Sequence, residues 1–175
     1  MRLFIAIDFD AAVKAALVDL QSQLRARCSS GTFSREGNLH LTLAFLGECD
    51  EAERVDAETA MDVGFEPFGL TIDGLGRFRG QGGDTWYAGL AKSSPLASLQ
   101  SRLVRRLKSA GLPVDAHPFH PHVTLARRVE SAASPWPCPP IQISVGRIVL
   151  MESHRLDGDL VYSPLAAKMA RDTRP

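Results

Sequence analysis

Two five-residue segments of the chain are nearly identical and carry the same chemically active residues. They are HLTLA at residues 40–44 and HVTLA at residues 122–126, a constant offset of 82 residues. Successive side chains of a strand point to opposite faces, so the histidine and the threonine of each copy share one face. The ordinary pKa of histidine lies near neutral pH, and threonine carries a hydroxyl. The paired segments therefore predict a site with two acid/base groups and two hydroxyl donors.

The sequence around each segment repeats the same order of elements. Apolar periodicity predicts a strand, a helix and then the motif strand in each half. The strands and helices that precede the motifs are expected at residues 2–8, 10–28, 85–91 and 94–110. At the offset of 82, Trp86 aligns with Phe4 and Ala88 with Ala6. This repeated organisation predicts two similar lobes, each of which presents one histidine and one threonine.

The other segments fit further strands and one helix. We expect an acidic helix over residues 49–63, a strand over 68–78, an exposed proline-rich connector over 131–140, and a hairpin from an alternating segment at 141–152 and a strand over 158–169. The predicted fold class is α+β, with two pseudo-symmetric lobes of antiparallel sheet, helices on the outside, and the two motif strands facing a central cleft. We expect a single domain over residues 1–175, with one lobe at about 1–80 plus C-terminal strands and the other at 81–175.

Length and composition allow this architecture and narrow the class of protein. A chain of 175 residues with 45% hydrophobic content can bury a core, and it is short for two independent domains. The 20 basic residues balance the 20 acidic ones, so the net charge does not indicate nucleic-acid or membrane binding. The cysteines, Cys28, Cys49 and Cys138, have no paired spacing. We expect a soluble, cytoplasmic, monomeric protein that does not bind membranes.

The extended motifs carry a family resemblance. HLTLAFLG at residues 40–47 and FHPHVTLAR at residues 119–127 resemble the paired His-x-Thr motifs of the two-histidine (2H) phosphoesterase superfamily. Within it, the chain is most similar to the RNA 2′,3′-cyclic phosphodiesterases, historically called 2′-5′ RNA ligases. The resemblance implies hydrolysis of an RNA 3′-terminal 2′,3′-cyclic phosphate to a 2′-phosphomonoester, with RNA 3′ ends as partners and with neither a cofactor nor a metal.

Hydrolysis of a cyclic phosphodiester suits the four motif residues. A base must deprotonate the attacking water, and an acid on the opposite side must protonate the departing ribose oxygen. Hydroxyls beside the phosphate can donate to its non-bridging oxygens, which is the role expected for Thr42 and Thr124. The residues alone leave open which histidine is the acid. The resemblance implies that His40 is the proton donor and His122 the proton acceptor.

Two further residues occupy equivalent positions, five residues after each histidine. The resemblance places Phe45 and Arg127 there, where they could hold a terminal base between them. Strict alternation puts both side chains on the face opposite the histidines, so this role needs a bulge or a turned strand end. The alternative is that Phe45 lies in the core and Arg127 pairs with a carboxylate.

Other charged residues have weaker patterns. His120 could form a metal-binding pair with His122, but Pro121 lies between them and no matching pair accompanies His40. We expect His117 and His154 to be surface or structural residues. The arginines at positions 35, 77, 79 and 128 could form a phosphate-attracting rim or belong to the solvated surface.

Other functions are compatible with the same motifs. Ligation of 2′-5′ RNA by the reverse reaction and hydrolysis of small cyclic nucleotides use the same groups. A non-catalytic RNA-binding module belongs to a different class, and it predicts the loss of a motif histidine or threonine, whereas all four are intact. The chain contains neither a GxxxxGK[ST] nor a GxSxG motif, which disfavours a nucleoside-triphosphate enzyme and a serine hydrolase.

Overall fold

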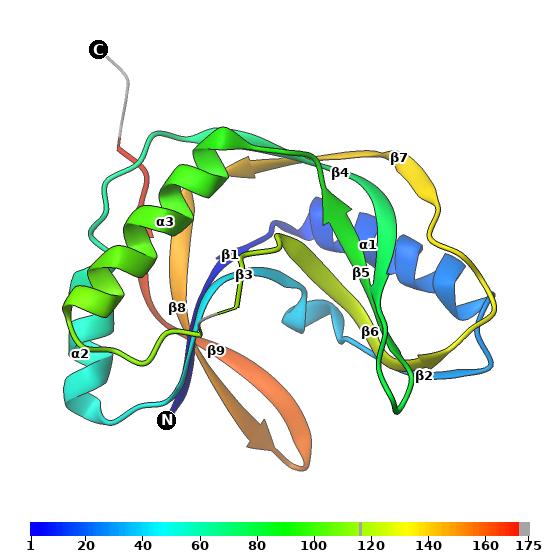
Figure 1. Ribbon diagram of the computed structural model, residues 1–175, viewed down its shortest axis with the longest axis horizontal. Helices are drawn as coiled ribbons and strands as arrows, with labels where there is room; N and C mark the ends of the chain where they lie inside the picture. The colour runs from blue at the N-terminus through cyan, green and yellow to red at the C-terminus, as the bar shows by residue number, and fades with distance from the viewer. Residues whose placement is uncertain (116, 172–175) are drawn as a thin grey trace.

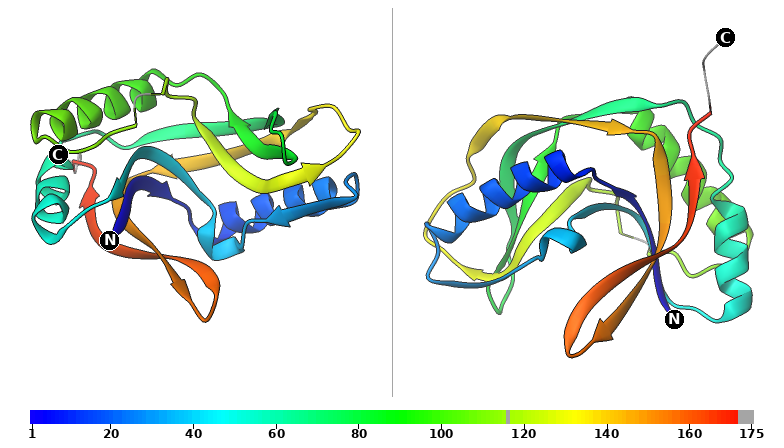
Figure 2. Two further views of the ribbon diagram at one scale, coloured as in Figure 1. Left: turned by 60° about the horizontal axis from the view of Figure 1, so that its bottom comes forward. Right: turned by 180° about the vertical axis from the view of Figure 1, so that it is seen from behind.

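A computed structural model, which describes residues 1–115 and 117–171, contains two antiparallel sheets and three helices (Figures 1 and 2). In spatial order, the first sheet consists of β3 (His40–Glu48), β1 (Arg2–Asp8), β8 (Arg147–Leu156) and β9 (Asp159–Met169). The second consists of β2 (Ser30–Phe33), β6 (His122–Glu130), β5 (Asp84–Leu90), β4 (Phe68–Phe78) and β7 (Pro137–Val145). The helices are α1 (Ala11–Arg25), α2 (Glu51–Ala60) and α3 (Ser94–Ser109), with a short 3-10 helix η1 (Glu36–Asn38) before β3.

The two sheets have matching strand orders. The order β3-β1-β8-β9 in the first corresponds to β6-β5-β4-β7 in the second, and β2 is an addition at the edge of the second sheet. Each motif strand therefore lies beside the first strand of its repeat, β3 beside β1 and β6 beside β5. The α+β class with two related antiparallel sheets is confirmed. Strands β8 and β9 lie in the first sheet, as expected for the C-terminal strands of the first lobe, whereas β2 and β4, which precede residue 80, lie in the second sheet.

Two predicted elements near the C-terminus were wrong. The connector expected over residues 131–140 ends early, because Pro137–Pro140 form the start of β7. Proline lacks a backbone N–H, but β7 lies at the edge of its sheet and has no partner strand on its outer side. Prolines are therefore tolerated in this strand. The alternating segment at 141–152 is two strands, which Gly146 divides between the two sheets. The final hairpin is instead formed by β8 and β9.

The helices begin at well-formed caps. The Asp10 side chain accepts from the Val13 N–H at the start of α1, Asp50 and Glu53 form a capping box on α2, and Ser93 caps α3. Each such cap stabilises a helix by about 0.5–2 kcal/mol. No helix in the described part of the chain has the length and hydrophobicity needed to cross a membrane.

Each of the two long helices packs against the sheet of the other half. Helix α1 follows β1 of the first sheet but contacts β6 and β7, and α3 follows β5 of the second sheet but contacts β3. The Gln21 side chain of α1 donates to the carbonyls of Leu125 in β6 and of Ser34. Most buried apolar residues of both sheets belong to one continuous core. This shared core supports the proposal that residues 1–175 form a single domain.

Candidate active site

A bulge in β3 brings a third side chain to the face that carries His40 and Thr42. Leu43 and Ala44 are both buried, although they are neighbours in a strand. In the pairing with β1, Ile5 lies opposite Ala44 and Ala6 opposite Thr42, so Leu43 is the extra residue. The alternation resumes one residue later. Phe45 therefore joins the face of His40 and Thr42.

Strand β6 contains the same bulge at the equivalent position. Leu125 and Ala126 are both buried. Thr124 and Ala126 pair with the adjacent β5 residues Tyr87 and Trp86, so Leu125 is the extra residue. The bulge turns Arg127 toward the face of His122. The structure thus supplies in both motifs the irregularity that a binding role for Phe45 and Arg127 requires.

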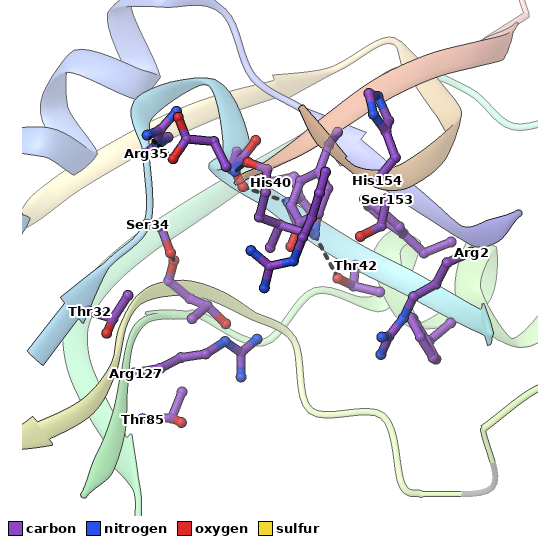
Figure 3. Close-up of a pocket in the computed structure, with 18 of the residues that line it drawn as sticks. Arg2, Thr32, Ser34, Arg35, His40, Thr42, Thr85, Arg127, Ser153 and His154 are labelled. Carbon is purple, nitrogen blue, oxygen red and sulfur yellow. Dashed lines mark hydrogen bonds and ion pairs between the residues drawn. The ribbon is translucent and has the colours of Figure 1, made fainter. Parts of the chain in front are cut away.

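All six predicted site residues line one cleft between the two sheets, with a volume of about 1430 Å³. They are His40, Thr42, Phe45, His122, Thr124 and Arg127. Figure 3 shows His40 and Thr42 on one side of this cleft and Arg127 reaching into it from the strand opposite. The sequence repeat therefore corresponds to two strands that present their polar faces to a common space.

His40 is held through both of its ring nitrogens. Its Nδ1 lies 2.8 Å from the carbonyl oxygen of Asn38, and its Nε2 lies 2.9 Å from the Thr42 hydroxyl (Figure 3). A carbonyl can only accept, so Nδ1 carries a proton and Nε2 is the nitrogen that exchanges one. The imidazole also packs against the rings of Phe4 and Tyr162, at centroid distances of 4.8 and 5.1 Å.

His122 has the same main-chain restraint in a different aromatic setting. Its Nδ1 lies 2.7 Å from the carbonyl oxygen of His120, two residues earlier, as Asn38 lies two residues before His40. Nε2 is again the nitrogen left for proton exchange. The rings of Phe78 and Tyr87 lie 5.1 and 5.4 Å from the imidazole. The two motifs therefore fix the same tautomer.

The charges around the two imidazoles differ. Burial has the largest effect and lowers the pKa of His40; the Asn38 carbonyl and then the Asp8 carboxylate act to raise it, and His122 and Lys14 lower it by smaller amounts. Asp8 lies opposite His40 in the β1–β3 pairing. Burial also lowers the pKa of His122, and the His120 and Arg127 side chains lower it further. The difference between the two sites is therefore the Asp8 carboxylate, which favours the protonated form of His40, whereas the groups that act on His122 through their charge disfavour its protonated form.

Phe45 and Arg127 both line the cleft but have different surroundings. Phe45 is half-buried at the cleft wall, and the Arg2 guanidinium lies 5.2 Å from the centre of its ring. Arg127 is exposed, and no carboxylate in the described part of the chain forms an ion pair with it. Of the alternative, the core contact of Phe45 is present, because Phe45 packs against the small buried cluster that contains Phe4 and Ala6, whereas the ion pair of Arg127 is absent among the described residues.

The cleft is locally basic although the chain is neutral overall. Among the described residues, its arginines are Arg2, Arg35, Arg127, Arg128 and Arg155, and its carboxylates are Glu48, Glu152 and Asp159. Of the arginines considered for a rim, Arg35 and Arg128 line the cleft, whereas Arg77 pairs with Asp84 outside it. The excess of positive charge favours an anionic ligand.

The remaining histidines divide between the cleft and its surroundings. The rings of His120 and His122 are 6.1 Å apart, and within residues 1–115 and 117–171 no group of three or more His, Cys, Asp or Glu side chains is arranged to hold a metal ion. His117 pairs with Asp115. His154 lines the cleft, and its Nε2 lies 2.8 Å from the hydroxyl of Ser163 on the neighbouring strand, a contact that is compatible with a structural role.

Sequence reasoning missed several cleft residues that come from outside the motifs. Tyr162 of β9 lies against His40, and Arg2 and Phe4 of β1 line the cleft beside it. Burial raises the pKa of the Tyr162 hydroxyl, and the nearby Arg127 and Arg2 oppose that shift. Tyr162 has no local motif, because only the pairing of β9 with β8 brings it to the first sheet.

Two related antiparallel sheets, each presenting a His-x-Thr strand to one cleft, define a two-histidine phosphoesterase fold. The chain belongs to the 2′-5′ RNA ligase superfamily, whose model matches residues 9–157.

Relatives with assigned activities cover nearly the whole chain. It is 31% identical to the RNA 2′,3′-cyclic phosphodiesterase of Thermotoga maritima, over 94% of this chain and 93% of that protein. It is 30% identical to the Escherichia coli RNA 2′,3′-cyclic phosphodiesterase over the same shares. A crystal structure of E. coli LigT complexed with 3′-AMP superimposes with a TM-score of 0.80 at 26% identity, covering 97% of this chain and 96% of that one. The structure of TT0787 from Thermus thermophilus has a TM-score of 0.79 at 29% identity, covering 99% of this chain and 100% of that one.

Proposed function

We propose that this protein hydrolyses RNA 3′-terminal 2′,3′-cyclic phosphates to 2′-phosphomonoesters by metal-independent acid/base catalysis with two histidines. The observation that carries this proposal is the matched restraint of His40 and His122. In each, a main-chain carbonyl holds Nδ1–H and leaves Nε2 for proton transfer at one cleft. The activity assigned to the Thermotoga maritima and E. coli relatives supports the same reaction.

The proposed reaction is a single in-line displacement at phosphorus. His122 Nε2 takes a proton from a water molecule, whose oxygen forms a new bond to phosphorus. The bond between phosphorus and O3′ breaks, and its electron pair goes to O3′, which takes the proton of His40 Nε2. The product carries a 2′-phosphate and a 3′-hydroxyl. Each proton transfer of this kind accelerates a reaction by about 10²–10⁴-fold.

The charges beside each histidine support this assignment of roles. The acid must be protonated before the reaction, and the Asp8 carboxylate favours the imidazolium form of His40. The base must be neutral, and His120 and Arg127 disfavour the imidazolium form of His122. The reverse assignment would require a cationic acid beside Arg127 and a neutral base beside a carboxylate.

Thr42 and Thr124 have matching places beside the phosphate in this proposal. Both hydroxyls line the cleft two residues after a histidine. Donation from a hydroxyl to a non-bridging oxygen stabilises the charge that develops as the bond to water forms. Phe45 and Arg127 would hold the terminal base, with stacking on the ring and on the guanidinium plane.

A product analysis tests the proposed function. An oligonucleotide that ends in a 2′,3′-cyclic phosphate is incubated with the enzyme, with and without EDTA, and the terminal phosphate is identified by ³¹P NMR and by phosphatase sensitivity. We expect a 2′-phosphate at the same rate in both incubations. A 3′-phosphate product would overturn the assigned leaving group, and loss of activity in EDTA would overturn metal independence. Addition of a 5′-hydroxyl acceptor strand separates ligation, which would give a joined product.

A further inference from the structure

Strand β6 contains a second irregularity directly after the bulge that turns Arg127 into the cleft. In the pairing with β5, Val129 lies opposite Asp84 and Ala126 opposite Trp86, so Arg127 and Arg128 together face the single residue between them. Arg128 has a φ of 53°, in the left-handed region that arginine rarely adopts. As a result, two consecutive arginines line the same cleft, where ordinary alternation would separate them.

Gly83 in the β4–β5 turn is packed against this unusual backbone. A Cβ at Gly83 would lie 2.6 Å from the carbonyl carbon of Arg128 and 2.8 Å from its Cα, and Gly83 itself has a φ of 100°. Only glycine allows the turn to approach so closely. Non-glycine residues in the left-handed region cost free energy, and they concentrate at sites that bind ligands. The arrangement points to a use for the Arg128 side chain in the cleft.

The Arg128 guanidinium has no acidic partner in the described part of the chain. Its one hydrogen bond there is a long one of 3.5 Å to the Thr32 hydroxyl. Asp159, a carboxylate of the same cleft, is instead paired with Arg35 at 2.5 Å. Arg127 next to it also lacks a carboxylate partner among these residues. Two neighbouring guanidinium groups repel each other, and an anion bound beside them removes that repulsion.

This pair lies at one end of a long cleft. Figure 3 shows Thr32 and Thr85 near Arg127, at the opposite end from Ser153 and His154. The cleft volume of about 1430 Å³ exceeds the roughly 300–1,000 Å³ that is typical of a site for one drug-sized ligand. The cleft therefore has room for more than the terminal nucleotide.

We propose that Arg128, together with the Thr32 hydroxyl, binds the phosphodiester that joins the terminal nucleotide to the one before it. We call this pair of residues the Arg128 subsite. A guanidinium binds phosphate oxygens through two parallel hydrogen bonds, and the adjacent hydroxyl adds a third donor. This inference rests on the proposed function and specifies its substrate class, which is an oligonucleotide of at least two nucleotides.

The test compares two substrates that share the same reacting group. They are adenosine 2′,3′-cyclic phosphate and an adenylyl dinucleotide that ends in the same cyclic phosphate, which adds one internucleotide phosphodiester. We expect the wild-type kcat/KM to be about tenfold higher for the dinucleotide, in line with one charge-assisted contact. R128Q should lose about tenfold more kcat/KM on the dinucleotide than on the mononucleotide. The dependence of log(kcat/KM) for the dinucleotide on log salt should weaken by about 0.7 in slope.

Two further variants separate charge from folding. R128G removes the guanidinium and suits the left-handed backbone, so it should fold as well as the wild type and show the same loss of preference as R128Q. R105Q removes an exposed arginine of α3 that lies outside the cleft, and it should keep the wild-type preference and salt slope.

The outcomes distinguish the subsite from the proposed function. If the wild type hydrolyses both substrates with equal kcat/KM, or if R128Q and R128G keep its preference, the Arg128 subsite is overturned while the function stands. If the wild type hydrolyses neither substrate, the proposed function itself fails. A preference that disappears in R128Q and R128G but persists in R105Q supports the subsite.

Discussion

The half of the cleft around His40 and the half around His122 share a backbone plan but differ in charge. Around His40, the cross-strand neighbour is Asp8, the packing partners are Phe4 and Tyr162, and Nε2 is bonded to Thr42. The side chain is the more buried of the two. This half places an imidazole next to a carboxylate.

Around His122, the equivalent cross-strand neighbour is Gly89, which carries no charge. The nearby ionisable groups are His120 and Arg127. The Nδ1 restraint is nevertheless the same as at His40. The difference teaches that a repeated strand can set the tautomer of two imidazoles, while residues outside the motifs give the two imidazoles different charged neighbours.

Removal of either histidine should have the largest effect and should separate the two roles. We expect H40A and H122A each to lower kcat by about 10²–10⁴-fold, with near-wild-type far-UV circular dichroism. A cyclic substrate with sulfur in place of O3′ has a leaving group that needs no proton. It should restore much of the activity of H40A and little of that of H122A. Equal restoration of both variants would contradict the assigned roles.

Substitution of Thr42 should lower kcat more than substitution of Thr124. T42V removes a phosphate donor and also the hydrogen bond to His40 Nε2, whereas T124V removes the phosphate donor. Loss of one such donor costs about 10²–10³-fold in kcat, and T42V should show the greater loss. Steady-state kinetics on a cyclic-phosphate dinucleotide measure both. A larger loss in T124V would show that the His40–Thr42 contact has no part in catalysis.

Charge removal should move the two limbs of the pH profile in opposite directions. D8N removes the carboxylate that raises the pKa of His40. An acid with a lower pKa is deprotonated earlier as the pH rises, so the alkaline limb of kcat/KM should move to lower pH. R127Q removes a charge that lowers the pKa of His122, so the acidic limb should move to higher pH. Shifts of the limbs in the other order would exchange the acid and the base.

The smallest effects concern the stability of the backbone beside the last residues of the two motif strands. Strand β3 has Gly47 at a φ of 79°, where a Cβ would meet the Phe45 ring at an ordinary contact distance of 3.9 Å, whereas β6 has Arg128 in the left-handed region with Gly83 against it. G83A should reduce the free energy of unfolding by about 1–3 kcal/mol, and G47A by less. G82A is the matched control, because a Cβ there meets nothing within 4 Å. Urea unfolding of the three variants measures the difference.

The paired motifs and their common cleft could be predicted from sequence because they are local. The offset of 82 places His40 and His122 at equivalent strand positions, and the structure brings both to one cleft. The offset of 82 does not hold for β1 and β5, the strands that precede the motifs in each repeat. Trp86 is buried in the main core, whereas Phe4 packs beside His40, and the cross-strand partners of the motif threonines are Ala6 and Tyr87. These strands repeat with an offset of 81, which is 87 − 6.

The bulges and the long-range partners could not be predicted in this way. A continuous apolar pair such as Leu43 and Ala44 fits a regular strand as well as a bulge, and only the pairing with β1 shows which residue is extra. Tyr162 reaches His40 because β9 pairs with β8, which is far from β3 in sequence. The prolines of β7 indicate a connector until the edge position of that strand is known.

The exchange of helices between the sheets bears on how the enzyme turns over. Helix α1 packs on the second sheet and α3 on the first, and each is joined to a strand of the opposite sheet by a connection of two or three residues. If the sheets moved apart, each helix would either strain that connection or leave the sheet it packs on, and loss of burial costs roughly 1.5–3 kcal/mol for each leucine. Two helices thus tie together the sheets that carry His40 and His122, and we expect the relative position of the two imidazoles to stay fixed during turnover.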